Sequence, residues 1–256
     1  MVHIAIILRG HERDTFQSNR LNQFINSLQN KFNNHQIIVC VHTWSETEAN
    51  QSWRKLNKIS KPMCESTIRN YFDIPIQTVI IDNENDIDLV GNLNGKFGSM
   101  PILAWKKMWY GQFKAIEHFS TYFSKQWYED PIVLNMRIDF FDCATTKKYK
   151  LTENHIFERL NVACDRINKI TFMQDTGEFD GIDNIIISSV SLMYMLLHHF
   201  HYNLDNIIIK YDFLMFHENS VYYEAQKMFG NNNVKINRFQ YLTAIALNHL
   251  KTLNNF

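Results

Sequence analysis

Short, continuous runs of apolar residues alternate along the first half of the chain with segments in which apolar side chains recur every three or four positions. Residues 4–8 and 37–41 form two such runs, and their richness in β-branched residues is typical of strands buried on both faces. Residues 21–32 lie between them and carry the helical period. A strand, a helix and a second strand within about 40 residues predict a βαβ unit with parallel strands.

The same alternation continues to residue 143. Residues 78–81 and 132–134 predict two further strands, and 102–123 predict a long helix with one apolar face. Residues 45–75 predict a loop with a short helix, and 82–98 are rich in the residues of turns. The elements expected after residue 143 are a helix at 156–167, a strand at 170–173, a strand and a helix within 182–203, a helix at 220–229 and a strand at 234–236.

This order of elements predicts an α/β fold, in which helices flank a Rossmann-type nucleotide-binding sheet. The 256 residues are enough for one large domain, and 45% of them are hydrophobic. We therefore expect a single compact domain over residues 1–256. Residues 1–143 would form its nucleotide-binding half. Residues 144–256 would form its acceptor-side half, which faces a second substrate.

The charge balance and the cysteine spacing indicate which classes of binding partner and which cellular compartment to expect. The 26 basic and 26 acidic residues balance, so bulk charge favours neither nucleic acid nor an anionic membrane, and neither is an expected partner. The four cysteines are scattered without a C-x-x-C pair, which is typical of reduced thiols in a cytosolic setting. The amino terminus lacks the basic leader of a signal peptide, and no run approaches the roughly 18 apolar residues of a membrane helix. The expectation is a soluble, cytoplasmic protein.

The four strands of the first half all end in residues that can carry chemistry. Because the carboxyl ends of parallel strands meet at one edge of a sheet, these side chains are expected to lie close together there, where open α/β sheets bind their ligands. The residues concerned are Arg9, Gly10 and Arg13 after the first strand, His42, Thr43 and Trp44 after the second, Asp82 after the third, and Arg137, Asp139 and Asp142 after the fourth.

Two kinds of side chain in this set predict a phosphorylated ligand with its metal ion. Arg9, Arg13 and Arg137 carry guanidinium groups that suit bidentate contact with phosphate oxygens. Asp139, with Asp142 three residues on, carries the oxygen ligands that a hard divalent cation prefers. The alternatives are an ion pair at the strand end for Arg137 and Asp139, and a solvated residue at a helix start for Arg13.

The other strand-end residues have weaker signals. Gly10 allows a close approach of the backbone to a ligand, and Trp44 offers a ring that would stack near a base or sugar. His42 offers an imidazole for hydrogen bonding. The alternatives are a satisfied buried histidine for His42 and a core residue for Trp44.

The second half offers a carboxylate that could act as a base. Asp183 precedes the apolar run 185–187, so a charged residue again meets a buried element, as a base that deprotonates an acceptor hydroxyl would require. The alternative is a helix cap or turn. Further acids lie in the turn 175–181, and His217 with Glu218 precedes the helix expected at 220–229. The histidines at 198–201 lie on an apolar helix without a third metal ligand and are expected to be structural.

Four short motifs follow one another along the chain: Leu8-Arg9-Gly10-His11-x-Arg13, Val41-His42-Thr43-Trp44, Met108-Trp109-Tyr110 and Arg137-x-Asp139. Taken in order, these motifs resemble a known family, the glycosyltransferases of bacterial capsule and lipopolysaccharide loci, which has relatives in large viruses and phages. The resemblance spans most of the chain and rests on short motifs. Asn135 and His217 depart from it, because the family more often has arginine and proline at these places.

The resemblance implies a GT-A-like fold and a nucleotide-diphosphate sugar as donor. Arg137-x-Asp139 stands where a metal-binding Asp-x-Asp would lie, so the implied cofactor is Mn²⁺ or Mg²⁺ held by Asp139 and Asp142. The expected reaction transfers the sugar to a hydroxyl group of a glycan or other acceptor, with Asp183 as the base, in the cytoplasm (the host's, for a viral protein). The alternatives are a non-catalytic nucleotide- or carbohydrate-binding protein and a metal-dependent nucleotidyltransferase or sugar-phosphate enzyme.

Overall fold

The computed structural model describes residues 3–48, 60–123, 130–142, 153–165, 169–174, 182–214 and 217–238. In the first half, the elements are β1 (His3–Arg9), a 3-10 turn (Thr15–Gln17), α1 (Arg20–Lys31), β2 (Gln36–Trp44), α2 (Glu65–Tyr71), β3 (Ile76–Asp82), β4 (Lys96–Phe97), β5 (Met100–Pro101), α3 (Ile102–Phe123) and β6 (Ile132–Arg137). They are followed by α5 (Glu153–Asp165), β7 (Ile170–Gln174), β8 (Ile185–Ser189), α6 (Val190–Lys210), α7 (Asn219–Phe229) and β9 (Val234–Arg238). None of these described helices combines the length and apolar composition needed to cross a membrane.

Within the described residues, seven strands form one sheet in the order β3-β2-β1-β6-β8-β7-β9, so both halves of the chain contribute to it. β1, β2, β3 and β6 are parallel, as the sequence predicts. β8 is antiparallel to its neighbours β6 and β7, and β9 is parallel to β7. The chain moves from β1 to β2 and β3 on one side, and β6 lies on the other side of β1. The order of the strands therefore reverses between β1 and β6.

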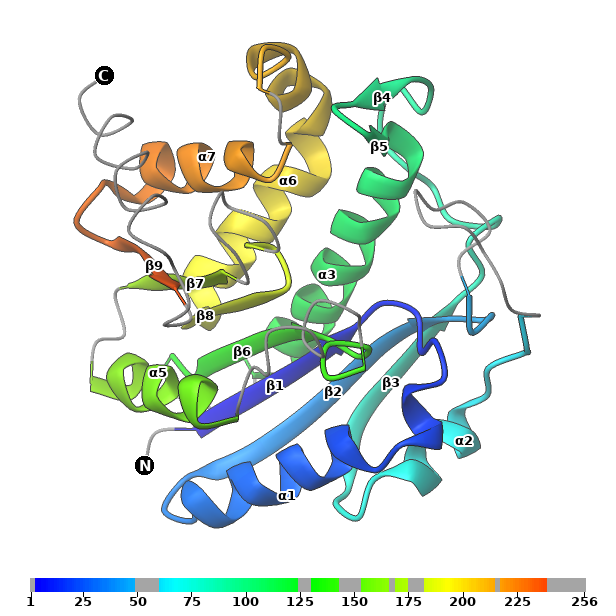
Figure 1. Ribbon diagram of the computed structural model, residues 1–256, viewed down its shortest axis with the longest axis vertical. Helices are drawn as coiled ribbons and strands as arrows, with labels where there is room; N and C mark the ends of the chain where they lie inside the picture. Colours follow the sequence, from blue (N-terminus) through cyan, green and yellow to red (C-terminus); the bar gives the residue numbers. More distant parts are fainter. Residues whose placement is uncertain are drawn as a thin grey trace.

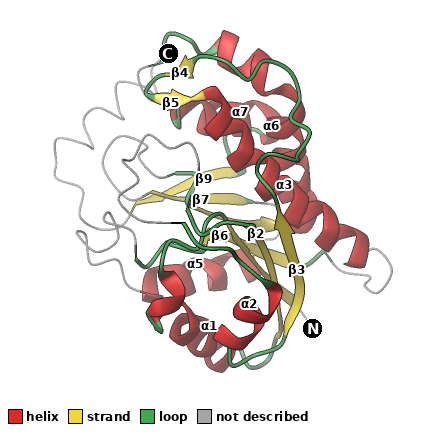
Figure 2. Ribbon diagram, turned by 90° about the vertical axis from the view of Figure 1, so that its right-hand side faces the viewer, coloured by secondary structure: helices red, strands yellow, loops and turns green. Residues whose placement is uncertain are grey.

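Helices cover both faces of the sheet. Figure 2 shows α1, α2 and α5 below it and α3, α6 and α7 above it, and Figure 1 shows α3 and α6 crossing the same face. The predicted α/β class is confirmed, and the mostly parallel sheet is compatible with a Rossmann-like fold. A short β4–β5 hairpin, which the sequence pattern did not predict, leads into α3.

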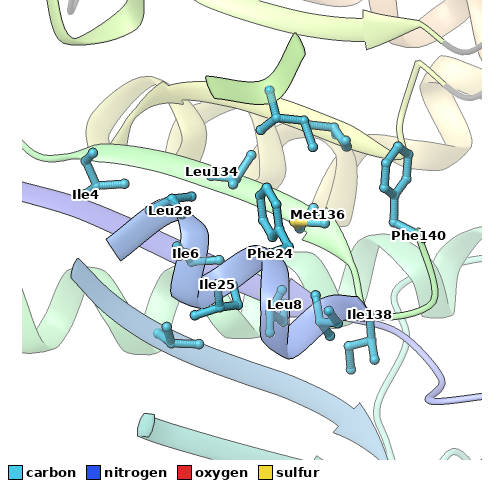
Figure 3. Close-up of a cluster of buried hydrophobic side chains, with 14 of the residues drawn as sticks. Ile4, Ile6, Leu8, Phe24, Ile25, Leu28, Leu134, Met136, Ile138 and Phe140 are labelled. Atoms are coloured by element: carbon cyan, nitrogen blue, oxygen red, sulfur yellow. The ribbon is translucent and has the colours of Figure 1, made fainter. Parts of the chain in front are cut away.

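The strands bury both faces because alternate side chains enter different cores. Ile4, Ile6 and Leu8 of β1 pack with α1, α2 and α5, whereas Ala5 and Ile7 pack with α3, α6 and α7. Figure 3 shows the first core, where apolar side chains of α1 lie over β1 and β6. Burial on both faces explains why these strands are continuous apolar runs and lack alternation.

The histidines predicted to be structural lie in the packing of α6. His201 stacks on Phe113 of α3, with ring centroids 4.9 Å apart, and His199 contacts Glu224 of α7 through Nε2 at 2.8 Å. Burial lowers the pKa of His201 to about 4, and the positive charge of Lys114 adds to this effect. His201 is therefore neutral in the folded protein at neutral pH.

This burial predicts a pH dependence of stability. The unfolded chain binds a proton at His201 below its ordinary pKa of about 6.5, whereas the folded protein does so only near 4. The free energy of unfolding should therefore fall as the pH decreases from about 6.5 towards 4. The variant His201→Phe keeps the ring and should lose less stability between pH 7 and pH 4.5 in urea unfolding. Equal losses of stability in wild type and H201F would contradict this assignment.

Candidate functional site at the reversal of strand order

The strand ends that carry the predicted site residues meet where the strand order reverses. Arg9, at the end of β1, is in register with His42 of β2 on one side and with Arg137 of β6 on the other. Trp44, at the end of β2, is in register with Asp82 of β3. The carboxyl ends of parallel strands beside such a reversal form the usual ligand crevice of open α/β sheets. The predicted convergence of these strand ends is confirmed.

At the centre of this edge, one carboxylate holds two guanidinium groups. Asp139 is only 4% exposed, and both of its oxygens accept from Arg137, at 2.8 Å from Nε and 2.6 Å from Nη2. Arg13 adds a third bond, from Nη1 to Oδ2 at 3.1 Å. Bidentate arginine–carboxylate pairs have a fixed geometry, so Asp139 sets the position of the Arg137 guanidinium group. Arg13 makes one bond to Asp139, and its Nε also lies 3.8 Å from Glu48 Oε2. The two arginine side chains remain 22% (Arg13) and 21% (Arg137) exposed, at the surface of the site.

Arg13 reaches Asp139 from a turn with an unusual backbone. Arg13 and Asp14 both have positive φ, 50° and 65°, and Gly10 begins the turn at φ 99°. The carboxylate of Glu12 accepts the backbone N–H groups of Asp14, at 3.0 Å, and Phe16, at 2.5 Å. Left-handed conformations cost energy for residues other than glycine and persist where surrounding contacts impose them. The turn therefore stores strain that places the Arg13 side chain over the strand ends.

This strain predicts that glycine at position 13 gives a more stable protein than alanine, which reverses their usual order of stability. Arg13→Gly and Arg13→Ala both remove the ion pair to Asp139, but only glycine adopts positive φ without cost. We expect Arg13→Gly to be about 1 kcal/mol more stable than Arg13→Ala in denaturant unfolding. An alanine variant as stable as the glycine variant, or more so, would show that Arg13 is unstrained.

Arg9 points into the protein. It is 3% exposed, and its guanidinium group donates to the carbonyl oxygen of Asp183 and to Oδ1 of Asn135 at 3.3 Å. Burial lowers the pKa of Arg9 to about 10, so Arg9 keeps its charge at neutral pH. Asn135 in turn donates to Oε1 of Gln112 on α3 at 2.9 Å. Arg9 thus adds positive charge beneath the site and ties the residues before β8 to the end of β1.

Asp183 lies at this edge because β8 runs antiparallel to β6. The amino end of β8 is therefore next to the carboxyl ends of β1 and β6, and Asn184 Oδ1 accepts from Arg137 Nη1 at 3.1 Å. Asp183 is 6% exposed. The structure brings Asp183 next to Arg9 through its backbone carbonyl, and its role as a base stays a prediction.

At the carboxyl end of β2, the aromatic side chains of the site are buried and pack against other rings. Trp44 is 3% exposed and lies near-parallel to His11 and to Tyr110, with ring centroids 5.8 Å and 6.1 Å away. His42 is fully buried, and its Nε2 lies 3.1 Å from Oδ2 of Asp82, which lowers the pKa of that carboxyl. In this arrangement Trp44 supports neighbouring rings, as the core interpretation of this residue expects, and stacking on a ligand stays a prediction.

The two predicted metal ligands are both engaged with other groups. Asp139 is bonded to two guanidinium groups, and Asp142 accepts from Ser18 Oγ at 2.8 Å with Arg20 Nη1 3.9 Å away. Across the described ranges, no three His, Cys, Asp or Glu side chains gather in a way that could hold a metal ion. Binding of Mn²⁺ or Mg²⁺ by Asp139 and Asp142 stays a prediction, and the residues present do not fit it in this arrangement.

The structure adds residues that the sequence analysis missed. Glu84 bridges two elements, because its oxygens lie 2.8 Å from His11 Nε2 and 3.1 Å from Lys107 Nζ of α3. Glu12 and Asn184 also belong to the site, although neither has a distinctive sequence signal. The acidic turn 175–181 lies outside the described residues. His217 is 8% exposed, and its ring packs edge-on against the ring of Trp105 on α3, with ring centroids 4.3 Å apart.

The comparisons with known proteins find no match for this chain, either among family models or among curated proteins. The function is therefore inferred from the geometry of the site together with the sequence resemblance.

Proposed function

We propose that this protein is a glycosyltransferase with a GT-A-like fold, which takes a sugar from a nucleotide-diphosphate donor and transfers it to a hydroxyl acceptor. The observation that carries the proposal is the pair of arginines, Arg13 and Arg137, fixed by Asp139 at the reversal of strand order. A diphosphate group carries several anionic oxygens, and planar guanidinium groups bind such oxygens in pairs. The sequence resemblance supports a sugar nucleotide as the source of the diphosphate.

The proposed reaction requires the protein to stabilise the departing diphosphate and to take a proton from the acceptor hydroxyl. As the bond between the sugar and the diphosphate breaks, negative charge grows on the departing phosphate oxygen. Arg13 and Arg137 would stabilise that charge, with Arg9 adding positive charge from below, and such preorganised stabilisation can be worth several kcal/mol. The acceptor oxygen forms a bond to the anomeric carbon, and its proton passes to the carboxylate of Asp183.

The experiment is a thermal-shift panel of nucleoside diphosphates and nucleotide sugars, followed by a measurement of nucleoside diphosphate release in the presence of candidate acceptors. One nucleotide should stabilise the protein, since a ligand at about 100 times its dissociation constant adds roughly 2.7 kcal/mol to the free energy of unfolding. Arg13→Gln should remove the shift. Arg69→Gln should keep it, because Arg69 lies at the surface of α2 and pairs with Glu65 at 2.7 Å.

The outcomes separate the proposed enzyme from its rivals. Stabilisation together with release that requires an acceptor supports a transferase. Stabilisation without turnover for any acceptor in the panel favours a non-catalytic binding protein. No stabilisation by any nucleotide would contradict the proposed donor.

A further inference from the structure

The Arg-x-Asp segment at the end of β6 differs from an Asp-x-Asp metal site in its charge and in its contacts, as well as in one residue. A hard divalent cation needs several oxygen ligands, and carboxylates usually supply the charged ones. Here the first position is Arg137, a cation, and its guanidinium group covers both oxygens of the remaining carboxylate, Asp139. The segment therefore presents positive charge at the place where the resemblance implies a bound metal ion.

We propose that the donor diphosphate is neutralised by the Arg13–Arg137 pair and that its binding requires no divalent cation at Asp139. This inference rests on the proposed function and concerns the same site. Asp139 is then a positioning residue, which holds the two guanidinium groups at the separation set by its own carboxylate. The ligand class is a nucleoside diphosphate bound through its phosphate oxygens.

The guanidinium groups bonded to both oxygens of Asp139 disfavour a metal ion at this carboxylate. Arg13 Nη1 and Arg137 Nη2 both lie within 3.1 Å of Asp139 Oδ2. Arg9 adds a third positive charge, and the charges of Asp183, Arg137 and Asp139 all influence its pKa. Glu48 Oε2 lies 3.8 Å from Arg13 Nε. A cation that replaced these bonds would face repulsion from the same guanidinium groups at short range. A diphosphate instead adds negative charge to their exposed edges and leaves their bonds to Asp139 in place.

The second predicted ligand is engaged elsewhere. Asp142 accepts a hydrogen bond from Ser18, at the start of the segment leading into α1, and lies near Arg20. Using Asp142 as a metal ligand would break these contacts. A divalent ion would then depend on one carboxylate that is already neutralised by two arginines.

Calorimetric titration of the wild-type protein with UDP, GDP, CDP, ADP and dTDP tests the inference. Each titration is done in EDTA and again with Mn²⁺ at equal concentration in cell and syringe. The nucleotide that binds should do so in EDTA, with a dissociation constant within about twofold of the Mn²⁺ value. Arg13→Gln should weaken this binding in EDTA at least about tenfold, whereas Arg69→Gln should not.

Two results overturn the inference in different ways. Binding that appears only with Mn²⁺, or tightens more than about tenfold with it, restores the metal role and leaves the proposed function standing. Absence of binding under both conditions removes the proposed donor and this inference with it. A second measurement is independent of nucleotide: the electron paramagnetic resonance signal of aqueous Mn²⁺ should be unchanged by the protein. A signal reduced by wild type and restored by Asp139→Asn would also contradict the inference.

Discussion

Replacing Asp183 with asparagine is expected to reduce sugar transfer by about 10²–10⁴-fold while leaving nucleotide binding within about twofold of wild type. The variant removes the proton acceptor but keeps the size of the side chain. It also keeps the backbone carbonyl that accepts from Arg9, so the residues before β8 should retain their position. Loss of activity without loss of binding separates a base from a ligand contact.

The measurement is the rate of nucleoside diphosphate release at saturating donor and acceptor, with binding followed by calorimetry. Asp212→Asn, which changes an exposed aspartate after α6, serves as the matched control and should behave as wild type. Full activity in Asp183→Asn would remove Asp183 from the proposed reaction and leave donor binding unaffected.

Asp139→Asn should have the largest effect on stability, about 3 kcal/mol in the free energy of unfolding. Asp139 is 4% exposed and accepts three bonds from Arg13 and Arg137, so the variant removes the negative charge bonded to both guanidinium groups. Glu48 Oε2 stays 3.8 Å from Arg13 Nε. Breaking a buried pair by changing one partner costs more than the pair contributes, because the remaining charge stays desolvated.

Urea unfolding at neutral pH measures this effect, again with Asp212→Asn as the control. Nucleotide binding should weaken as well, since one carboxylate then no longer fixes the separation of the two arginines. A change in stability below about 0.5 kcal/mol would show that Asp139 is a surface partner of the kind that contributes little.

The strand ends were predictable because the buried strands are continuous apolar runs that stop at polar or charged residues. Residues 4–8, 37–41, 78–81 and 132–134 all lie within observed strands. Once these strands are parallel, Arg9, His42 and Arg137 must lie at one edge, whatever the loops between them do.

The direction of β8 was not predictable from its pattern. An apolar run such as 185–187 has the same composition whether the strand is parallel or antiparallel. That direction places Asp183 at the site, so the location of the proposed base became clear only from the fold.

The orientation of the arginines also needed the structure. Arg9 follows Ala5 and Ile7 on the face of β1 that packs against α3 and α6, so its guanidinium group is buried. Arg13 and Asp139 are 126 positions apart in the chain. They meet because Arg13 has a positive φ, which the sequence does not indicate for an arginine. Long-range pairs of this kind follow from packing and not from local spacing.

The central claim is that a nucleoside diphosphate binds at the reversal of strand order, with its phosphates on Arg13 and Arg137. A crystal structure of the complex with the nucleotide selected by the thermal-shift panel tests this most directly. We predict phosphate oxygens within hydrogen-bonding distance, about 2.7–3.2 Å, of both guanidinium groups, above the ends of β1 and β6. A nucleotide bound away from this edge, or with its phosphates turned from both arginines, would contradict the account.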